Sequence, residues 1–349
     1  MNNELANLWI VTPVHAGHND RMPKLPVAPV SHANGLHTIL GAGGVVGHEL
    51  SLQLARAGRR IRQVSRHPAA VCAGDELVTT DLTDAWATAA GVAGSEVVYL
   101  VAGLAYNAAI WQAQWPIVMR NVIDACARHG ARLVFFDNVY AYGRVDGVMT
   151  EDTSFNPCSR KGYVRAVIAT TLLESMRRGE VQALIARSAD FYGPGANLSL
   201  LASVLFSRLR AGKAPQWIGN PEAVHTFTFT PDAGRALAAL GQSPAAFGQT
   251  WHLPTARDLG SEAVTGKALT RVACTLAGQP DRLQVAPRWL LTVMGLFVPM
   301  LRENDEMLYQ FAHDYRFDSS KVEKALGWRA TPYGEGLAQT WRAVCQTPH

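Results

Sequence analysis

A glycine-rich segment near the start of the chain has the spacing of a phosphate-binding turn. It reads Gly41-Ala42-Gly43-Gly44-Val45-Val46-Gly47, which is GxxGxxG as spaced and GxGxxG with one extra residue. A strand is predicted before it at Leu36–Leu40, and apolar spacing predicts a helix after it at Val46–Ala57. Glycines allow a tight turn and close approach of a pyrophosphate, to which the helix N-terminus presents unpaired N–H groups. The segment predicts a dinucleotide site; the alternative is a glycine-rich turn without a ligand.

The end of the second predicted strand, Arg60–Ser65, indicates which dinucleotide binds. An acidic residue usually stands about 20 positions beyond the glycines and binds the ribose diol of NAD. The stretch from residue 61 to residue 68 contains no carboxylate and offers Ser65 and Arg66 instead. Arginine can bind a 2′-phosphate through a charge-assisted pair of hydrogen bonds. The sequence therefore predicts NADP rather than NAD, unless Arg66 is only a solvated surface residue.

Two later segments complete the predicted cofactor site. Asp81 and Leu82 follow the third predicted strand, Glu76–Thr80, and the Asp81 side chain could reach an adenine amino group. It could equally begin a helix or close a turn. The segment Val101-Ala102-Gly103 ends the fourth strand with small residues, which let a cofactor lie close to the backbone but also pack well without one.

Several short segments occur in an order and spacing that resemble one known family. Between Leu36 and Trp341 the chain is similar to the extended short-chain dehydrogenases/reductases, the NAD(P)-dependent epimerase/dehydratase family. The resemblance implies a Rossmann domain, hydride chemistry on a nicotinamide cofactor and a second domain that binds the substrate. The segments that carry it are Gly41–Gly47, Asp81–Asp84, Tyr99–Gly103, Phe136–Gly143, Arg187–Gly195, Tyr315–Lys321 and Leu326–Trp328.

The catalytic positions that this family implies carry different residues here. Asn138 stands where the family has Ser or Thr, and Lys161 and Arg165 stand where it has a Tyr-x-x-x-Lys pair. Asn138 can donate a hydrogen bond to a carbonyl oxygen, and Arg165 can hold the nicotinamide ribose but accepts no proton. Lys161 is predicted to donate a proton, helped by the positive charges of Arg165 and an oxidised nicotinamide. The alternative for Lys161 and Arg165 is a solvated helix face.

Three residues are predicted to contact the substrate. Asp190 stands where the family usually has Asn, and a hydroxyl-rich or cationic substrate could use its carboxylate. The alternative for Asp190 is an ion pair with Arg187 or Arg165. Tyr106 begins a long helix near the cofactor edge, and Tyr142 lies at a strand end as a pocket wall, although it could also be a packed aromatic.

The elements that must position these residues alternate between strands and helices. This alternation is typical of βαβ units and predicts an α/β fold with a Rossmann-type, doubly wound parallel sheet. Beyond Asp190 the pattern loosens, which predicts a smaller, mixed C-terminal substrate domain over the carboxyl edge of the sheet. The predicted divisions are an N-terminal extension at 1–34, an NAD(P)-binding Rossmann domain at 35–190 and a substrate-binding region at 191–349, with part of 224–256 returning to the Rossmann domain.

Composition argues against several other classes of protein. The 349 residues are 48% hydrophobic and 17% charged, as in a globular enzyme, and the net charge of +4 without charge runs predicts no nucleic-acid partner. The apolar run Trp289–Leu301 is shorter than the roughly 20 residues of a membrane span, so no membrane association is predicted. Five scattered cysteines without a CxxC pair predict no disulfide framework, no metal site and a cytoplasmic location.

The sequence supports two main hypotheses of function. The first is an NADP-dependent oxidoreductase or epimerase-like enzyme that acts on a small carbonyl or hydroxyl compound with a modified catalytic set. The second, favoured by the missing Tyr and Lys, is an NADP-binding sensor or scaffold without turnover; a third and weaker one is non-redox chemistry in the second domain. The predicted helices Asn107–Arg128 and Lys161–Arg178 resemble the pair through which the family forms two-fold dimers, so a homodimer is expected.

Overall fold

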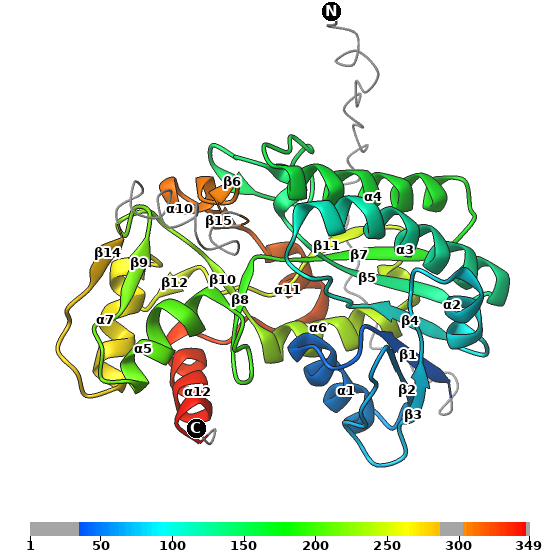
Figure 1. Cartoon of the computed structure of the whole chain (residues 1–349), viewed down its shortest axis with the longest axis horizontal. Helices are drawn as coiled ribbons and strands as arrows, with labels where there is room; N and C mark the ends of the chain where they lie inside the picture. Colours follow the sequence, from blue (N-terminus) through cyan, green and yellow to red (C-terminus); the bar gives the residue numbers. More distant parts are fainter. Residues whose placement is uncertain (1–34, 287–302, 304, 347–349) are drawn as a thin grey trace, which may run out of the picture.

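The computed structural model describes residues 35–286, 303 and 305–346, so the predicted N-terminal extension and the apolar run at 289–301 lie outside the described residues. Within these ranges the chain builds a parallel sheet of seven strands in the order β11-β7-β5-β4-β1-β2-β3 (Figure 1). The strands are β1 (Leu36–Leu40), β2 (Arg60–Ser65), β3 (Glu76–Thr79), β4 (Val97–Leu100), β5 (Arg132–Asn138), β7 (Ala183–Ser188) and β11 (Thr250–His252). This order confirms the predicted Rossmann-type, doubly wound sheet.

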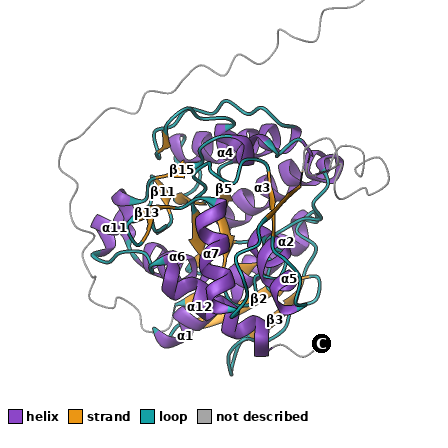
Figure 2. Ribbon diagram, turned by 90° about the vertical axis from the view of Figure 1, so that its left-hand side faces the viewer, coloured by secondary structure: helices purple, strands orange, loops and turns teal. Residues whose placement is uncertain are grey.

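Helices cover both faces of the sheet, and Figure 2 shows the strands between the two helical layers. One layer packs on the sheet through α2, α3 and α4, and the other through α1, α6 and α11. Because both faces are covered, every residue of β1, β4 and β7 is buried, as parallel strands require. The helices are α1 (Val45–Arg56), α2 (Ala85–Val92), α3 (Ala108–His129), α4 (Arg160–Arg177), α6 (Thr230–Gln242) and α11 (Ser320–Leu326).

A second, smaller region lies beyond the carboxyl ends of the strands, on the left of Figure 1. It has its own apolar core, built around large side chains such as Trp217, Phe206 and Tyr333. No helix in the described ranges has the length and apolar character that a membrane crossing demands. The elements of this region are β8 (Asp190–Tyr192), α5 (Ser207–Arg210), β9 (Gln216–Ile218), β10 (Phe227–Phe229), β12 (Asp258–Leu259), β13 (Glu262–Ala263), α7 (Gly266–Leu276), β14 (Gln284–Ala286) and α12 (Tyr333–Gln346).

Three further short elements join the two parts of the molecule. β6 (Val148–Met149) pairs in parallel with β15 (Arg316–Phe317), and α10 (Tyr309–Ala312) precedes β15. The chain also returns from the smaller region: α6 and β11 follow β10 in the sequence but belong to the layers of the main sheet. The chain therefore passes between the two parts more than once.

The turn after β1 can be built only with glycine at its first position. Gly41 has φ +93°, and its N–H donates to the carbonyl oxygen of Val64 at 2.9 Å. A Cβ at Gly41 would lie 2.2 Å from the Cα of Ala102, which is far inside van der Waals contact with backbone. The turn is thus held between the ends of β2 and β4, and this fixes where α1 begins.

Gly41→Ala should destabilise the fold by about 3 kcal/mol, because the substitution combines backbone strain with a steric clash. Gly58→Ala is the matched control: Gly58 has φ +68° but nothing within 4 Å of its Cβ position, so it should cost only about 1 kcal/mol. Urea denaturation measures both. Equal losses for the two variants would show that the contact with Ala102 is unimportant.

Candidate functional site

The other three glycines of the turn have different roles at the N-terminus of α1. Gly43 has φ +100° and nothing within 4 Å of its Cβ position, whereas Gly47 lies against Ile39 of β1 and Val101, the residue after β4. Gly44 is the N-cap residue and supplies no side-chain hydrogen bond to the helix. The N–H groups of Val45 and Val46 therefore begin a helix that no side chain of its N-cap satisfies. An open turn with an uncapped helix N-terminus is the geometry that binds a pyrophosphate.

The residues predicted to select the dinucleotide lie at the ends of β2 and β3. Arg66 is exposed and forms no ion pair or hydrogen bond with any other described residue. The Ser65 Oγ is buried and likewise has no partner in the described ranges. Oδ1 of Asp81 accepts hydrogen bonds from the N–H and Oγ of Thr83 at 2.9 and 2.8 Å, so Asp81 closes a turn. These hydrogen bonds, with a contribution from the Arg66 charge, lower the pKa of Asp81.

The end of β4 forms the other side of the turn. Val101 is buried, Ala102 lies against Gly41, and Gly103 has nothing within 4 Å of its Cβ position. Leu82 is half-buried, and its carbonyl oxygen accepts a hydrogen bond from Asn121 at 2.9 Å. The carboxyl edge of the sheet thus brings the predicted cofactor residues of four separate strand ends together.

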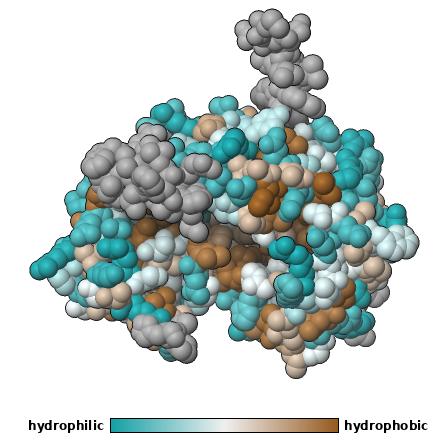
Figure 3. Space-filling view, viewed as in Figure 1, coloured by the Kyte–Doolittle hydropathy of each residue, from teal (hydrophilic) through white to brown (hydrophobic). Residues whose placement is uncertain are grey.

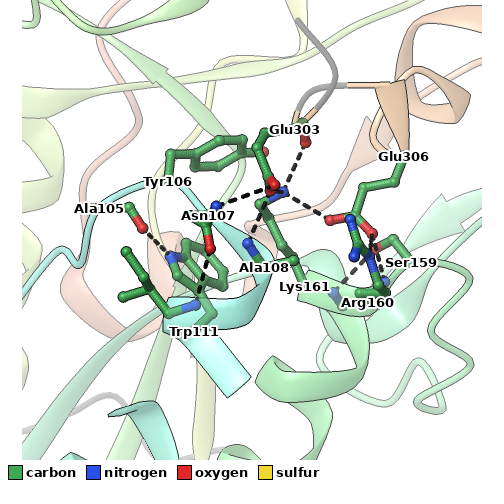
Figure 4. A network of polar contacts seen from close by, with 12 residues as sticks. Ala105, Tyr106, Asn107, Ala108, Trp111, Ser159, Arg160, Lys161, Glu303 and Glu306 are labelled. Carbon is green, nitrogen blue, oxygen red and sulfur yellow. Dashed lines mark hydrogen bonds and ion pairs between the residues drawn. The ribbon is translucent and has the colours of Figure 1, made fainter. Parts of the chain in front are cut away.

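Lys161 lies in a closed ion cluster, which Figure 4 shows. Its ammonium donates to the backbone oxygen and Oε2 of Glu303, at 2.7 and 2.8 Å, and to Oε1 of Glu306 at 2.8 Å. The Lys161 side chain is 0% exposed, and its Nζ lies 4.6 Å from the centre of the Tyr106 ring. An ammonium has three N–H groups, and these three acceptors use them all. The sequence predicted that Lys161 lies beside positive charges, with a solvated helix face as the alternative. Both are wrong, because carboxylates enclose its ammonium group.

The same two glutamates cap the helices that meet at Lys161. Oε2 of Glu303 accepts from the N–H of Ala108, the first residue of α3, at 2.9 Å, and Oε1 accepts from Asn107 at 3.2 Å. Oε2 of Glu306 accepts from the N–H of Arg160, the first residue of α4, at 2.7 Å. Negative charge at a helix N-terminus is favourable, so each glutamate is stabilised both by Lys161 and by the N-terminus of a helix. The hydrogen bonds from Ala108 and, above all, Lys161 hold the pKa of Glu303 below its ordinary value.

Arg165 is also buried rather than solvated. It is 4% exposed, and its Nε donates to Oδ1 of Asp137 at 2.7 Å, while its Nη2 donates to the same oxygen. The guanidinium carbon lies 4.6 Å from the centre of the Trp115 ring. Arg187, which is 1% exposed, donates to Oδ2 of Asp137 at 3.3 Å, so the two arginines share one carboxylate. Asp137 engages Nε and Nη2 of Arg165, so the predicted contact with a ribose would have to use Nη1.

Asn138 ends β5 with a side chain whose orientation is fixed. Its Oδ1 accepts a hydrogen bond from the N–H of Tyr140 at 3.0 Å, and its own N–H donates to Asp137 at 2.8 Å. Because only Oδ1 can accept from Tyr140, Nδ2 must be the other atom of the amide. No described residue accepts a hydrogen bond from Nδ2, which leaves this donor available at the carboxyl edge.

The structure corrects the prediction for Tyr142. Its side chain is 0% exposed, and its hydroxyl lies 2.8 Å from Nε2 of His252 and accepts from Nη1 of Arg187 at 2.9 Å. A phenol that is fully buried with two strong partners has no surface to offer a ligand. Tyr142 is a packed aromatic, which is the alternative that the sequence left open.

Tyr106 and Asp190 remain accessible near the carboxyl edge. Tyr106 is 38% exposed, and its hydroxyl lies 3.5 Å from that of Tyr140. The Asp190 side chain is 19% exposed, and its Oδ2 lies 3.0 Å from Nε2 of His225. The alternative of an ion pair between Asp190 and one of the two arginines is wrong, because both arginines bind Asp137. Figure 3 shows the molecule hollowed between its two parts, with apolar side chains gathered in the hollow.

Sequence reasoning missed three charged residues of this region. Asp137 has a detectable signal, because a carboxylate in an otherwise apolar strand indicates a buried ionic partner. Glu303 and Glu306 have none, since they lie 142 and 145 residues from Lys161 in the sequence. In the described ranges, no group of three or more His, Cys, Asp and Glu side chains could hold a metal ion.

Comparison with known proteins identifies the family. A family model described as the NAD dependent epimerase/dehydratase family matches residues 37–253. The chain belongs to this family. Membership confirms the resemblance found in the sequence and makes the chain an NAD(P)-dependent enzyme of the extended short-chain dehydrogenase type. No curated protein is similar enough to count as a relative.

Solved structures of epimerases and dehydratases share the fold of this family member. MoeE5 in complex with UDP-glucose and NAD has 21% identity and a TM-score of 0.69, with 89% of this chain and 99% of that chain covered. The dTDP-glucose 4,6-dehydratase DesIV from Streptomyces venezuelae has 18% identity and a TM-score of 0.72, with 89% and 97% covered. UDP-glucose 4-epimerase from Thermotoga maritima has 18% identity and a TM-score of 0.71, with 89% and 99% covered.

Lys161→Met should destabilise this epimerase/dehydratase family member by about 3 kcal/mol, because the substitution leaves Glu303 and Glu306 without their buried counter-ion. Urea denaturation at neutral pH measures the loss. Lys267→Met is the matched control: Lys267 pairs with Glu222 at 2.8 Å, but the two side chains are 54% and 62% exposed, so its loss should stay within about 0.5 kcal/mol. Equal losses of unfolding free energy in the two variants would show that the burial of Lys161 does not strengthen its contribution to stability.

The ion cluster around Lys161 should also make the free energy of unfolding depend on pH. The pKa of Glu303 lies below its ordinary value of 4.5 in the folded state, so its contribution is present above that value and is lost as the pH falls through the folded pKa. Between neutral pH and acid, the free energy of unfolding should therefore fall more steeply in the wild type than in Lys161→Met. Parallel curves would mean that Lys161 does not hold Glu303 in its charged form.

Proposed function

We propose that this chain is a cytoplasmic, NADP-dependent oxidoreductase or epimerase-like enzyme that acts on a small hydroxyl or carbonyl compound. The observation that carries the proposal is the open, uncapped N-terminus of α1 at the glycine turn, with an unpaired arginine and no carboxylate at the end of β2. All five cysteines lie in the described ranges and are free, which supports a reducing compartment.

The residues present fit NADP. The open space at Gly43 and Gly103 leaves room for a backbone-close ligand, and the first N–H groups of α1 would hold the pyrophosphate. Arg66 would pair with a 2′-phosphate, and the partnerless Ser65 Oγ would donate to the same group. The MoeE5 and DesIV structures contain NAD, so the choice of NADP rests on these two side chains. When bound, the nicotinamide supplies hydride transfer.

A hydroxyl-rich substrate suits the residues at the carboxyl edge. MoeE5 is in complex with UDP-glucose and DesIV is a dTDP-glucose 4,6-dehydratase, so proteins with this fold take sugar nucleotides. In this chain the proposal gives Nδ2 of Asn138 the task of holding the substrate oxygen, and gives Tyr106 and Asp190 the substrate contacts. Proton transfer by Lys161 belongs to the proposal only for a state in which Glu303 and Glu306 have released it. Arg165 would bind the ribose through Nη1, which Asp137 does not engage.

The proposal includes a two-fold homodimer through α3 and α4. These helices pack side by side on one face of the sheet, and each exposes apolar side chains. Ile117 on α3 is 47% exposed, and Tyr163 and Val167, one turn apart on α4, are 49% and 37% exposed. A two-fold axis beside this face would bury both helices against their copies.

Arg66→Glu should weaken NADPH binding by about 100-fold and leave NADH binding within about twofold, because only NADPH carries the 2′-phosphate. Titration with each dinucleotide, followed by nicotinamide fluorescence, measures both. Lys213→Glu makes the same charge change in an exposed loop and should alter neither affinity.

Unchanged NADPH affinity in Arg66→Glu would remove the basis for NADP. Failure of the wild type to bind either dinucleotide would overturn the whole proposal. Tight binding with no turnover of any carbonyl or hydroxyl compound would instead support a sensor or scaffold.

Val167→Glu should convert the dimer into monomers, because it places a charge in the centre of the buried helix face. Analytical ultracentrifugation measures the change. Leu198→Glu is the control: Leu198 is fully exposed and lies off these helices, so the dimer should persist. A wild type that sediments as a monomer would contradict this part of the proposal.

A further inference from the structure

Asp190 lies among tyrosines that come from separate parts of the chain. Its partner His225 is 2% exposed and stacks on the ring of Tyr315, with centroids 4.3 Å apart and 5° between the planes. On the other side, the Tyr106 and Tyr140 hydroxyls lie 3.5 Å apart. The Asp190 carboxylate adds to the effect of burial in raising the pKa of Tyr106 to about 12. It acts in the same direction on the pKa values of Tyr140, Tyr309 and Tyr315.

Polar groups in this cluster lack partners. Tyr315 is 5% exposed, and in the described part of the chain its hydroxyl has no hydrogen bond to another side chain; only the backbone of Asp190 lies beside it. Nδ1 of His225 is buried without a hydrogen-bonding partner there, and the Tyr309 hydroxyl is buried with only the Cys158 thiol beside it. Buried polar groups are normally hydrogen-bonded, so such exceptions mark a place where a bound molecule supplies the missing bonds. Nε2 of His225 occupies only Oδ2 of Asp190, which leaves the second carboxylate oxygen available.

Among the described residues, the charges that act on the Tyr106 hydroxyl are negative: the carboxylates of Asp190, Glu303 and Glu306. The ammonium of Lys161 faces the Tyr106 ring, but both glutamates already bind it. The two buried arginines bind Asp137, and Arg187 also lies over the ring of Tyr142. A ligand phosphate would therefore meet carboxylates, whereas a cation would meet a carboxylate and electron-rich rings.

We propose that Asp190, with the rings and hydroxyls of Tyr106, Tyr140, Tyr309 and Tyr315, binds an ammonium group of the substrate. The substrate class is then a small hydroxylated amine rather than a nucleoside diphosphate sugar. The ammonium pairs with the free oxygen of Asp190, lies against the phenol rings, and brings hydroxyls that satisfy Tyr309 and Tyr315. The ring of Tyr106 already contacts one ammonium, that of Lys161. This inference rests on the proposed function, because it names the substrate of that same site.

The test compares three probes that share one sugar ring: D-glucosamine, D-glucose and D-glucose 1-phosphate. Each is titrated into the full chain with saturating NADPH in neutral buffer, and calorimetry or ligand-observed NMR reports the affinity. Glucosamine should bind about tenfold more tightly than glucose, as one partly buried cation site predicts, and glucose 1-phosphate should bind most weakly.

Two variants test whether Asp190 and Tyr106 cause the preference for glucosamine over glucose. Asp190→Asn removes the charge with little change of shape and should bring glucosamine to within about twofold of glucose. Tyr106→Leu removes a half-exposed ring and should reduce the preference even if Asp190→Asn does not fold. Asp124→Asn, at a position on α3 that is 61% exposed, makes the same change as Asp190→Asn away from the site and should alter nothing.

Tighter binding of glucose 1-phosphate, binding of none of the probes, or a preference for glucosamine that survives Asp190→Asn would each overturn the inference. NADPH affinity is measured on the same samples. If NADPH binds and glucosamine does not, the inference fails alone; if NADPH does not bind, the proposed function fails as well.

Discussion

A single buried carboxylate, Asp137, determines how the carboxyl edge of the sheet is organised. Two buried arginines, Arg165 from α4 and Arg187 from β7, would be costly charges without it. Arg187 also binds Tyr142, which binds His252, so the network continues across the sheet to β11. Burial lowers the pKa of His252 to about 3, which keeps this imidazole neutral inside the network. One charge thus links the helix that carries the altered catalytic positions to the far strand of the sheet.

Charged partners surround the two positions at which the sequence predicts that the family's Tyr and Lys are replaced. Lys161 and Arg165 would place two cations beside a cofactor, but Lys161 binds two carboxylates and Arg165 shares that of Asp137 with Arg187. Their charge is therefore satisfied by protein before any ligand arrives. The nucleotide turn, by contrast, keeps its open helix N-terminus. Under the proposed function, cofactor binding and proton transfer would therefore use separate groups, and the chemistry would fall to residues that the network leaves accessible, such as Asn138 and Tyr106.

The sequence was sufficient for the sheet and the glycine turn but insufficient for the altered catalytic positions. Local patterns determine a strand such as Leu36–Leu40, and a parallel sheet follows from their alternation with helices. The surroundings of Lys161 depend on Glu303 and Glu306, which no local pattern connects to it. Tyr142 was misplaced for a related reason: its partners His252 and Arg187 come from other strands. Residue type predicts what a side chain can do, whereas tertiary contacts decide whether it is free to do it.

The capping of α3 and α4 by Glu303 and Glu306 also bears on how the protein can be divided. Both helices belong to the layers of the main sheet, yet their first N–H groups depend on residues that lie 195 and 146 positions later in the sequence. A fragment that ends before Glu303 would retain every strand of the main sheet but would bury Lys161 without an anion. The two parts are therefore one cooperative unit, and the nucleotide-binding half is not a module that could be excised or exchanged on its own.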